Sequence, residues 1–376
     1  KNDGDTVEIC FNSTVNFNAD TSGFNSPVYA WDFGSGSPSS STSKQQNVTF
    51  GVSGIQQVSL LTSDASNLDS AWLFVMVRDS INAGSITPST AQICYDTNTN
   101  LSLTNTSGGD SIYVYTWEQS LSGANSWSGD TGATNSTSYN TGLLFVSHDY
   151  RVRVTSGCGV EDTSSILMVD VASEFVSGTI SGVDTICYNT IPTVLTLTGF
   201  TGGRSPYTYQ WQSKSSSGNN WVNVGIDSAY YQETTSLLTS TDYRVNLTSS
   251  QGCGMVSSTV KLVTVRDSIV PSSISSSQII CYNTLPQALT RTDATGADSN
   301  FVYDWEWSLN GSSGWTSTGQ VGLTYAPGTL TAHRWFRVKV TNVLCTVVNY
   351  SNMVNVFVRD SIVPSSISSS QIICYN

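Results

Sequence analysis

The sequence repeats itself with a period of about 93 residues. Cysteines in the same local sequence, ICYD or ICYN, stand at Cys94, Cys187, Cys281 and Cys374, so neighbouring copies are 93 or 94 residues apart. Residues 266–283 return without a change at 359–376. This period is too long for a solenoid repeat and matches a small independent domain. The sequence therefore predicts a tandem array of domains that is part of a longer polypeptide.

Each unit of the array has the pattern of a β-domain. In YTYQWQ, residues 207–212, aromatic and polar side chains alternate, and DYRVNL at 242–247 alternates in the same way. About seven such strands fit into one period, which is typical of an Ig-like sandwich. We predict an all-β fold of tandem Ig-like β-sandwich domains arranged as beads on a string. The predicted boundaries are 1–78 for a divergent first domain, 79–172, 173–265 and 266–358 for three repeats, and 359–376 for the start of the next.

Tryptophans keep the same phase as the cysteines. Trp117, Trp211 and Trp305 follow their cysteines by 23 or 24 residues, and we predict that they and Trp31 are core residues of their sandwiches. A second set, ten residues later, is expected to pack on a neighbouring strand, with stacking on a sugar as the alternative; it comprises Trp127, Trp221 and Trp315.

Cysteine spacing predicts one disulfide inside each repeat. In a seven-stranded sandwich we expect the first strand to begin and the sixth to end at the same pole of the domain. The predicted bonds are Cys94–Cys158, Cys187–Cys253 and Cys281–Cys345, whose partners are 64, 66 and 64 residues apart. Cys10 and Cys374 are left unpaired in this chain.

Charge and motifs exclude several functions. The net charge of −12 disfavours nucleic acid and anionic membranes as partners, and no segment has the length and apolarity needed for membrane insertion. No catalytic motif recurs among the repeats, so we expect no enzyme activity. With two histidines, His148 and His333, and no Cys-x-x-Cys pair, we expect no metal or other cofactor. Calcium at Asp3 and Asp5 or at Asp293 and Asp298 is the alternative, with solvated turns favoured over it.

Two resemblances cover nearly the whole chain. The first domain, with Trp31, Asp32, Phe33, Gly34 and Gly36, resembles the polycystic-kidney-disease-type Ig-like domain, although Ser35 replaces the usual Asp. The later units, with YQWQSKSSSGNNW and DYRVNLTSSQGCG, resemble the Ig-like repeats of giant surface adhesins of Bacteroidota. This resemblance implies an extracellular cell-surface protein exported by type IX secretion, which forms a stalk or filament for cell adhesion, gliding motility or prey capture.

The implied partners are other copies of the chain in a multi-stranded filament, and a surface, prey or glycan ligand that we leave open. The alternative function is a carbohydrate-binding module that uses exposed aromatic side chains. Short Asp-Ser/Thr-apolar triplets also resemble the O-glycosylation acceptor of Bacteroidota, with ordinary turn chemistry as the competing interpretation. The candidate acceptors are Thr6, Ser70, Ser80, Ser111, Thr185, Ser228, Ser268 and Ser361.

Overall fold

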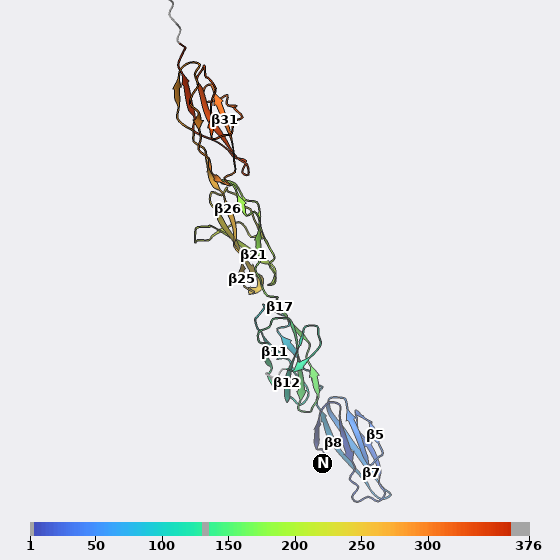
Figure 1. The fold of residues 1–376 in the computed structure, drawn as a ribbon. Coiled ribbons are helices and arrows are strands. Elements are labelled where there is room, and N and C mark those ends of the chain that lie inside the picture. Colours follow the sequence, from blue (N-terminus) through green and yellow to red (C-terminus); the bar gives the residue numbers. More distant parts are fainter. Residues whose placement is uncertain (1–3, 130–134, 362–376) are drawn as a thin grey trace, which may run out of the picture. The chain divides into compact units, whose positions relative to one another are not determined.

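The fold of the chain, seen in a computed structural model that describes residues 4–129 and 135–361, consists of β-sandwiches (Figure 1). This confirms the predicted all-β class. Among the described residues, the one helical element is the single 3-10 turn η1, Ser250–Gly252. The chain divides into two compact units: Lys1–Val176 with Phe200–Tyr207 and Thr248–Val256, and Ser177–Gly199 with Thr208–Leu247 and Ser257–Asn376.

The first sandwich packs a five-stranded sheet, in the order β1-β8-β7-β3-β5, on a three-stranded sheet, β2-β6-β4. Its core contains Phe17, Trp31, Phe33 and Phe50, all buried. Its strands are β1 Thr6–Ile9, β2 Ser13–Asn18, β3 Val28–Asp32, β4 Gly36–Ser37, β5 Ser40–Ser41, β6 Gln45–Phe50, β7 Gly54–Ser63 and β8 Leu68–Val77.

The second sandwich has a large sheet, β10-β17-β15-β12-β13 with β16 on β15, and a small sheet, β14-β11-β9. Tyr150, Val152 and Val154 alternate with the arginines of β15 and are fully buried, as the alternating sequence predicts. Its strands are β9 Ser85–Thr87, β10 Ala91–Ile93, β11 Asn100–Thr104, β12 Tyr113–Leu121, β13 Ser128–Gly129, β14 Ser138–Asn140, β15 His148–Ser156, β16 Glu161–Thr163 and β17 Leu167–Val171.

The third sandwich forms the sheets β19-β26-β24-β21-β22 and β18-β20-β23. Trp211 and Tyr243 are fully buried in it. Its strands are β18 Thr179–Ser181, β19 Thr185–Ile186, β20 Leu195–Thr198, β21 Tyr207–Ser215, β22 Val222–Val224, β23 Tyr230–Tyr231, β24 Thr241–Ser249, β25 Met255–Ser257 and β26 Lys261–Val265.

The fourth sandwich repeats the large sheet as β28-β36-β34-β31-β32 with β35 on β34, and adds the pairs β27-β30 and β29-β33. Trp305 and Phe336 are fully buried in its core. Its strands are β27 Asp267–Val270, β28 Gln278–Ile280, β29 Leu289–Thr290, β30 Thr295–Ala297, β31 Phe301–Ser308, β32 Thr316–Ser317, β33 Thr324–Tyr325, β34 Arg334–Asn342, β35 Val348–Tyr350 and β36 Val354–Val358.

Strand direction defines two poles in each sandwich. We name the end where the chain comes in the proximal pole, and the end where the last strand finishes the distal pole. In the second sandwich β10 runs parallel to the last strand, β17, and Ile93 lies opposite Val171 at the distal pole. β15 runs antiparallel to β17, so its last residue, Ser156, lies at the proximal pole. The parallel pairs β1–β8, β19–β26 and β28–β36 give the other sandwiches the same geometry.

Candidate functional site: disulfides at the sandwich poles

The disulfides in the described part of the chain join consecutive sandwiches. Each connects the distal pole of one sandwich to the proximal pole of the next. They are the first bridge, Cys10–Cys158, the second bridge, Cys94–Cys253, and the third bridge, Cys187–Cys345, with Cα–Cα distances of 6.0, 5.1 and 5.8 Å.

The predicted pairing inside each repeat is therefore wrong. Cys10, predicted to be unpaired, is bonded, and Cys281, predicted to be bonded to Cys345, is an exposed free thiol. Cys374 lies outside the described residues.

Strand direction explains the error. Cys94 follows the strand that runs parallel to β17, whereas Cys158 follows β15, which is antiparallel to β17. β15 has nine residues, so at 3.4 Å per residue the two poles are about 30 Å apart. A disulfide requires Cα atoms within about 7 Å, which excludes a bond between cysteines at opposite poles.

The sequence contained a signal for the correct pairing. The first domain has the single cysteine Cys10, which pairing inside the repeats leaves without a partner. If each cysteine near the start of a domain is paired with the later cysteine of the following domain, Cys10 gains a partner, Cys158. The paired cysteines are then 148, 159 and 158 residues apart. These separations are less uniform than the 64, 66 and 64 residues inside the repeats, so spacing alone favoured the wrong scheme.

A shared turn holds the distal cysteine of every repeat. The residue two positions after the cysteine has positive φ, and a threonine one position later donates its hydroxyl to the cysteine carbonyl. The distances from Thr97 Oγ1 to Cys94 O, from Thr190 Oγ1 to Cys187 O and from Thr284 Oγ1 to Cys281 O are 2.6, 2.7 and 2.7 Å. The positive-φ residues are Asp96, Asn189 and Asn283, at 56°, 59° and 58°. The backbone thus presents the distal cysteines in one conformation.

Polar contacts surround the second bridge. Arg204, near the proximal pole of the third sandwich, donates to the Asp170 carboxylate at 2.9 Å and to the carbonyls of Asp170 and Ile93 at 2.5 and 3.2 Å. Its side chain is 14% exposed. Gln251 Nε2 donates to Gln92 Oε1 at 3.1 Å. The ends joined by this bridge therefore also share an ion pair and hydrogen bonds, so the covalent bond is one part of a larger contact.

The segments between sandwiches are held on both sides. The amide of Arg78 donates to Ile9 O of the first sandwich at 3.0 Å, and the next residue, Asp79, accepts from the amide of Gly109 in the second sandwich at 2.9 Å. In each repeat, a glycine with positive φ lies against a carbonyl of this segment, and an added Cβ would overlap that oxygen. The pairs are Gly108 with Ser80, Gly202 with Glu174, and Gly296 with Ser268. These hydrogen bonds and close contacts restrict the backbone of the linker.

The predicted core tryptophans are buried in their sandwiches. Trp117, Trp211 and Trp305 are fully buried and Trp31 is 8% exposed. Each indole N–H donates to a backbone carbonyl, with distances of 2.8 to 3.0 Å to Ser43, Ser136, Ser228 and Gly322. The buried rings therefore leave no indole N–H without an acceptor.

The second tryptophan of each repeat is half-buried beneath an arginine. The guanidinium carbon lies 4.1 to 4.3 Å from the ring centroid, in the pairs Arg151–Trp127, Arg244–Trp221 and Arg337–Trp315. The same arginines donate Nε to Glu118, Gln212 and Glu306 at 2.7 to 2.8 Å. Because the arginine covers one face of the ring, that face is closed to a sugar, and glycan binding stays a prediction.

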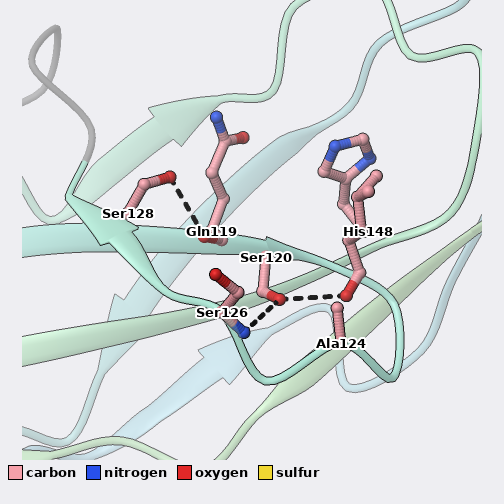
Figure 2. Close-up of a pocket in the computed structure, with 7 residues that line it drawn as sticks. Gln119, Ser120, Ala124, Ser126, Ser128 and His148 are labelled. Atoms are coloured by element: carbon pink, nitrogen blue, oxygen red, sulfur yellow. Dashed lines mark hydrogen bonds between the residues drawn. The ribbon is translucent and has the colours of Figure 1, made fainter.

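A pocket of about 240 Å³ beside β12 holds His148 and several serines (Figure 2). The Ser120 hydroxyl donates to the Leu121 carbonyl at 2.9 Å, and that of Ser128 to the Gln119 carbonyl at 3.3 Å. His148 Nδ1 lies 2.9 Å from the Val146 carbonyl. Ser120 and Ser128 thus donate to backbone carbonyls rather than to the histidine, so neither has the base that activates a serine nucleophile.

The acidic residues considered for calcium have protein partners. Asp293 pairs with Arg291 at 2.6 Å, and Asp298 accepts from Asn342 Nδ2 at 2.6 Å, a hydrogen bond that lowers the pKa of the Asp298 carboxyl. Asp3 lies outside the described residues. In residues 4–129 and 135–361, no three His, Cys, Asp or Glu side chains gather as a metal site would require, and no helix is long and apolar enough to cross a membrane.

Most candidate glycosylation residues are accessible. Ser228 is half-buried, and the others are exposed: Thr6, Ser70, Ser80, Ser111, Thr185, Ser268 and Ser361. Exposure permits modification at these hydroxyls, and the modification itself stays a prediction.

Comparison with known families matches the three repeats to a single model. This model, described as a domain of unknown function, DUF8696, matches residues 82–173, 176–267 and 270–360. The sequence matches no curated protein.

Solved structures with similar folds are multi-domain proteins. The N-terminal four Ig domains of Dscam1 isoform 6.9 are 10% identical, with 96% of this chain and 98% of that chain covered and a TM-score of 0.25. An E-to-A variant of titin domains I67–I69 is 11% identical, with 69% and 94% covered and a TM-score of 0.39. Chicken CNTN1 domains FN1–FN3 are 12% identical, with 74% and 98% covered and a TM-score of 0.28. At these scores we draw no functional conclusion from them.

Proposed function

The chain belongs to the DUF8696 family, and from the way its repeats are bonded to one another we propose that it is a tension-bearing segment of an extracellular stalk or filament. The observation that carries the proposal is the set of three bridges between consecutive sandwiches. Disulfides of this kind form and persist in oxidising compartments, which supports a location outside the cell.

The bridges suit a chain that has to keep its length under tension. Tension applied along an unbridged array unfolds domains one after another, and each releases its residues. Here the shortest covalent route from Cys10 to Cys345 crosses the first bridge, follows the chain from Cys158 to Cys187, and crosses the third bridge. That route contains about 29 peptide units, or about 100 Å when fully extended, compared with about 1,200 Å for the unbridged chain. Complete unfolding would therefore lengthen the segment little.

The wider role follows the resemblance to surface adhesins of Bacteroidota. We propose that the segment belongs to a cell-surface protein exported by type IX secretion, that its predicted domain boundaries at 78, 172, 265 and 358 mark the beads of the stalk, and that copies associate into a multi-stranded filament. Gliding motility and prey capture are the two roles that such a stalk would fit. We further propose O-linked glycans at the exposed candidate hydroxyls; intact-mass spectrometry of native material that gives the bare peptide mass would contradict this.

Single-molecule pulling tests the mechanical role. The chain is held at its two ends, and the total contour length between Cys10 and Cys345 is determined with and without reductant. We expect no more than about 100 Å of contour from the oxidised chain and about 1,200 Å after reduction. If the oxidised chain lengthens by one full domain at a time, the bridges do not carry the tension and the proposal is wrong.

A further inference from the structure

Cys281 has the same backbone surroundings as the disulfide-bonded distal cysteines, but its thiol is free. It follows β28, which runs parallel to the last strand of its sandwich, as the bonded Cys94 follows β10. Arg359 N donates to Ile280 O at 2.9 Å, as Ala172 N donates to Ile93 O at 2.9 Å. The backbone that precedes Cys281 is therefore anchored in the same way as the backbone that precedes Cys94.

The turn after Cys281 is also the same as in the bonded repeats. Thr284 donates to the Cys281 carbonyl, Asn283 has positive φ, and the Asn283 amide donates to Leu330 O at 3.0 Å. In the repeat bonded through Cys187, the amide of Asn189 donates to Leu237 O at 2.9 Å. The backbone of Cys281 is therefore held in the same way as the backbone of the equivalent cysteines that form bridges.

The occupied distal poles identify the kind of partner. In each of the three bridges, the distal cysteine meets a proximal-pole cysteine from the turn after the long strand of the following sandwich: Cys158 after β15, Cys253 after β24, and Cys345 after β34. We propose that the distal pole around Cys281 is a docking surface for the proximal pole of one further repeat of this family, with a disulfide between Cys281 and the proximal-pole cysteine of that repeat. This inference concerns binding and stands whether or not the chain carries tension.

Bond formation requires an oxidant. Two thiols lose two protons and two electrons as the S–S bond forms, and a small-molecule disulfide accepts them and becomes two thiols. Oxidised glutathione supplies this in a refolding experiment.

The sequence allows a direct test. Residues 359–376 are identical to 266–283, so adding a copy of residues 284–358 after Asn376 completes one further repeat with a sequence known to form a sandwich. The added copy contains an equivalent of Cys345, 93 residues further along and 157 residues after Cys281. One conservative substitution beside this added cysteine and a second beside Cys374 give their peptides masses distinct from those of Cys345 and Cys281, which are otherwise identical in sequence.

The extended chain is oxidised with glutathione, treated with iodoacetamide and mapped by mass spectrometry without reduction. We expect the peptide of Cys281 to be linked to that of the added cysteine, the three existing bridges to be retained, and Cys374 to be alkylated as the new distal thiol. Alkylation of both Cys281 and the added cysteine would overturn the inference, as would a bond between Cys281 and Cys374.

A matched variant replaces the added cysteine with serine. The same sandwich is then present without its thiol, so Cys281 should be alkylated while the circular dichroism spectrum is unchanged. Gel filtration separates the two sources of a partner: a disulfide-linked dimer through Cys281 would identify a second copy and refute the assignment to the following repeat. The result of this test does not depend on that of the pulling experiment, because Cys281 is not part of the shortest covalent route from Cys10 to Cys345.

Discussion

Removing one bridge at a time separates the bridges that limit extension from the one that does not. The shortest route from Cys10 to Cys345 uses the first and third bridges and does not use the second. A double substitution of Cys94 and Cys253 with serine should therefore leave the maximum contour between Cys10 and Cys345 at about 100 Å.

Loss of the third bridge should have a much larger effect. With Cys187→Ser and Cys345→Ser, the shortest route crosses the first bridge, runs back from Cys158 to Cys94, crosses the second bridge and continues from Cys253. It contains about 156 peptide units, so the contour should rise to about 550 Å. The two variants are matched, because each loses one disulfide between consecutive sandwiches and gains two serines.

The assay is force spectroscopy at constant pulling speed, with contour lengths fitted to complete unfolding. Equal contour lengths between Cys10 and Cys345 in the two variants would refute the route through the first and third bridges. Bonds inside each repeat would instead allow about 500 Å in the unsubstituted chain, so that value would show that the cysteines pair as the spacing first suggested.

Three other predictions concern stability and titration. Gly202→Ala should lower the unfolding free energy more than its control, Gly199→Ala. Both substitutions force an L side chain into positive φ, at a cost of about 1–2 kcal/mol, but only the Cβ at 202 also overlaps a backbone carbonyl. Thermal unfolding compares the two variants, and equal losses of stability would argue against the linker packing. Arg337→Met should cost about 2–3 kcal/mol in urea unfolding, because it leaves a largely buried carboxylate unpaired; a loss below about 0.5 kcal/mol would contradict this. The Asp64 carboxyl accepts from the Asn25 amide and other loop amides, which lower its pKa from 3.8 to about 2, so the stability it contributes is present above about pH 3.8 and is lost as the pH falls through 2; an NMR titration with a midpoint near 3.8 would count against it.

The repeat and the fold could be predicted because both depend on local sequence. Alternation in DYRVRV places Tyr150 and Val152 in the core, and the periodic Trp117 marks the buried strand of its sheet. The cysteine partners could not be predicted in the same way, since they depend on the direction of one short strand relative to the last. β10 has three residues, too few for sequence alone to determine whether it pairs parallel or antiparallel, and this choice places Cys94 at one pole or the other.

The contacts around the bridges were also beyond sequence reasoning. Arg204 and Asp170 are 34 residues apart and carry no motif, and their ion pair exists because the fold brings two poles together. The glycines that pack against the linkers could have been found from the sequence. Gly108 and Gly202 recur in phase with the cysteines, and this periodicity indicates close packing of the backbone at these positions.

The placement of one distal and one proximal cysteine in each repeat has a consequence for inheritance. A duplication that copies a whole repeat adds one cysteine of each kind, so every new copy can be bonded to both neighbours and no thiol in the array is left without a partner. A duplication of half a repeat would leave a thiol without a match. The identical stretches 266–283 and 359–376 contain the linker and the distal cysteine, the parts that any neighbour has to fit. Gene length can therefore vary in whole repeats while a disulfide still joins each sandwich to the next.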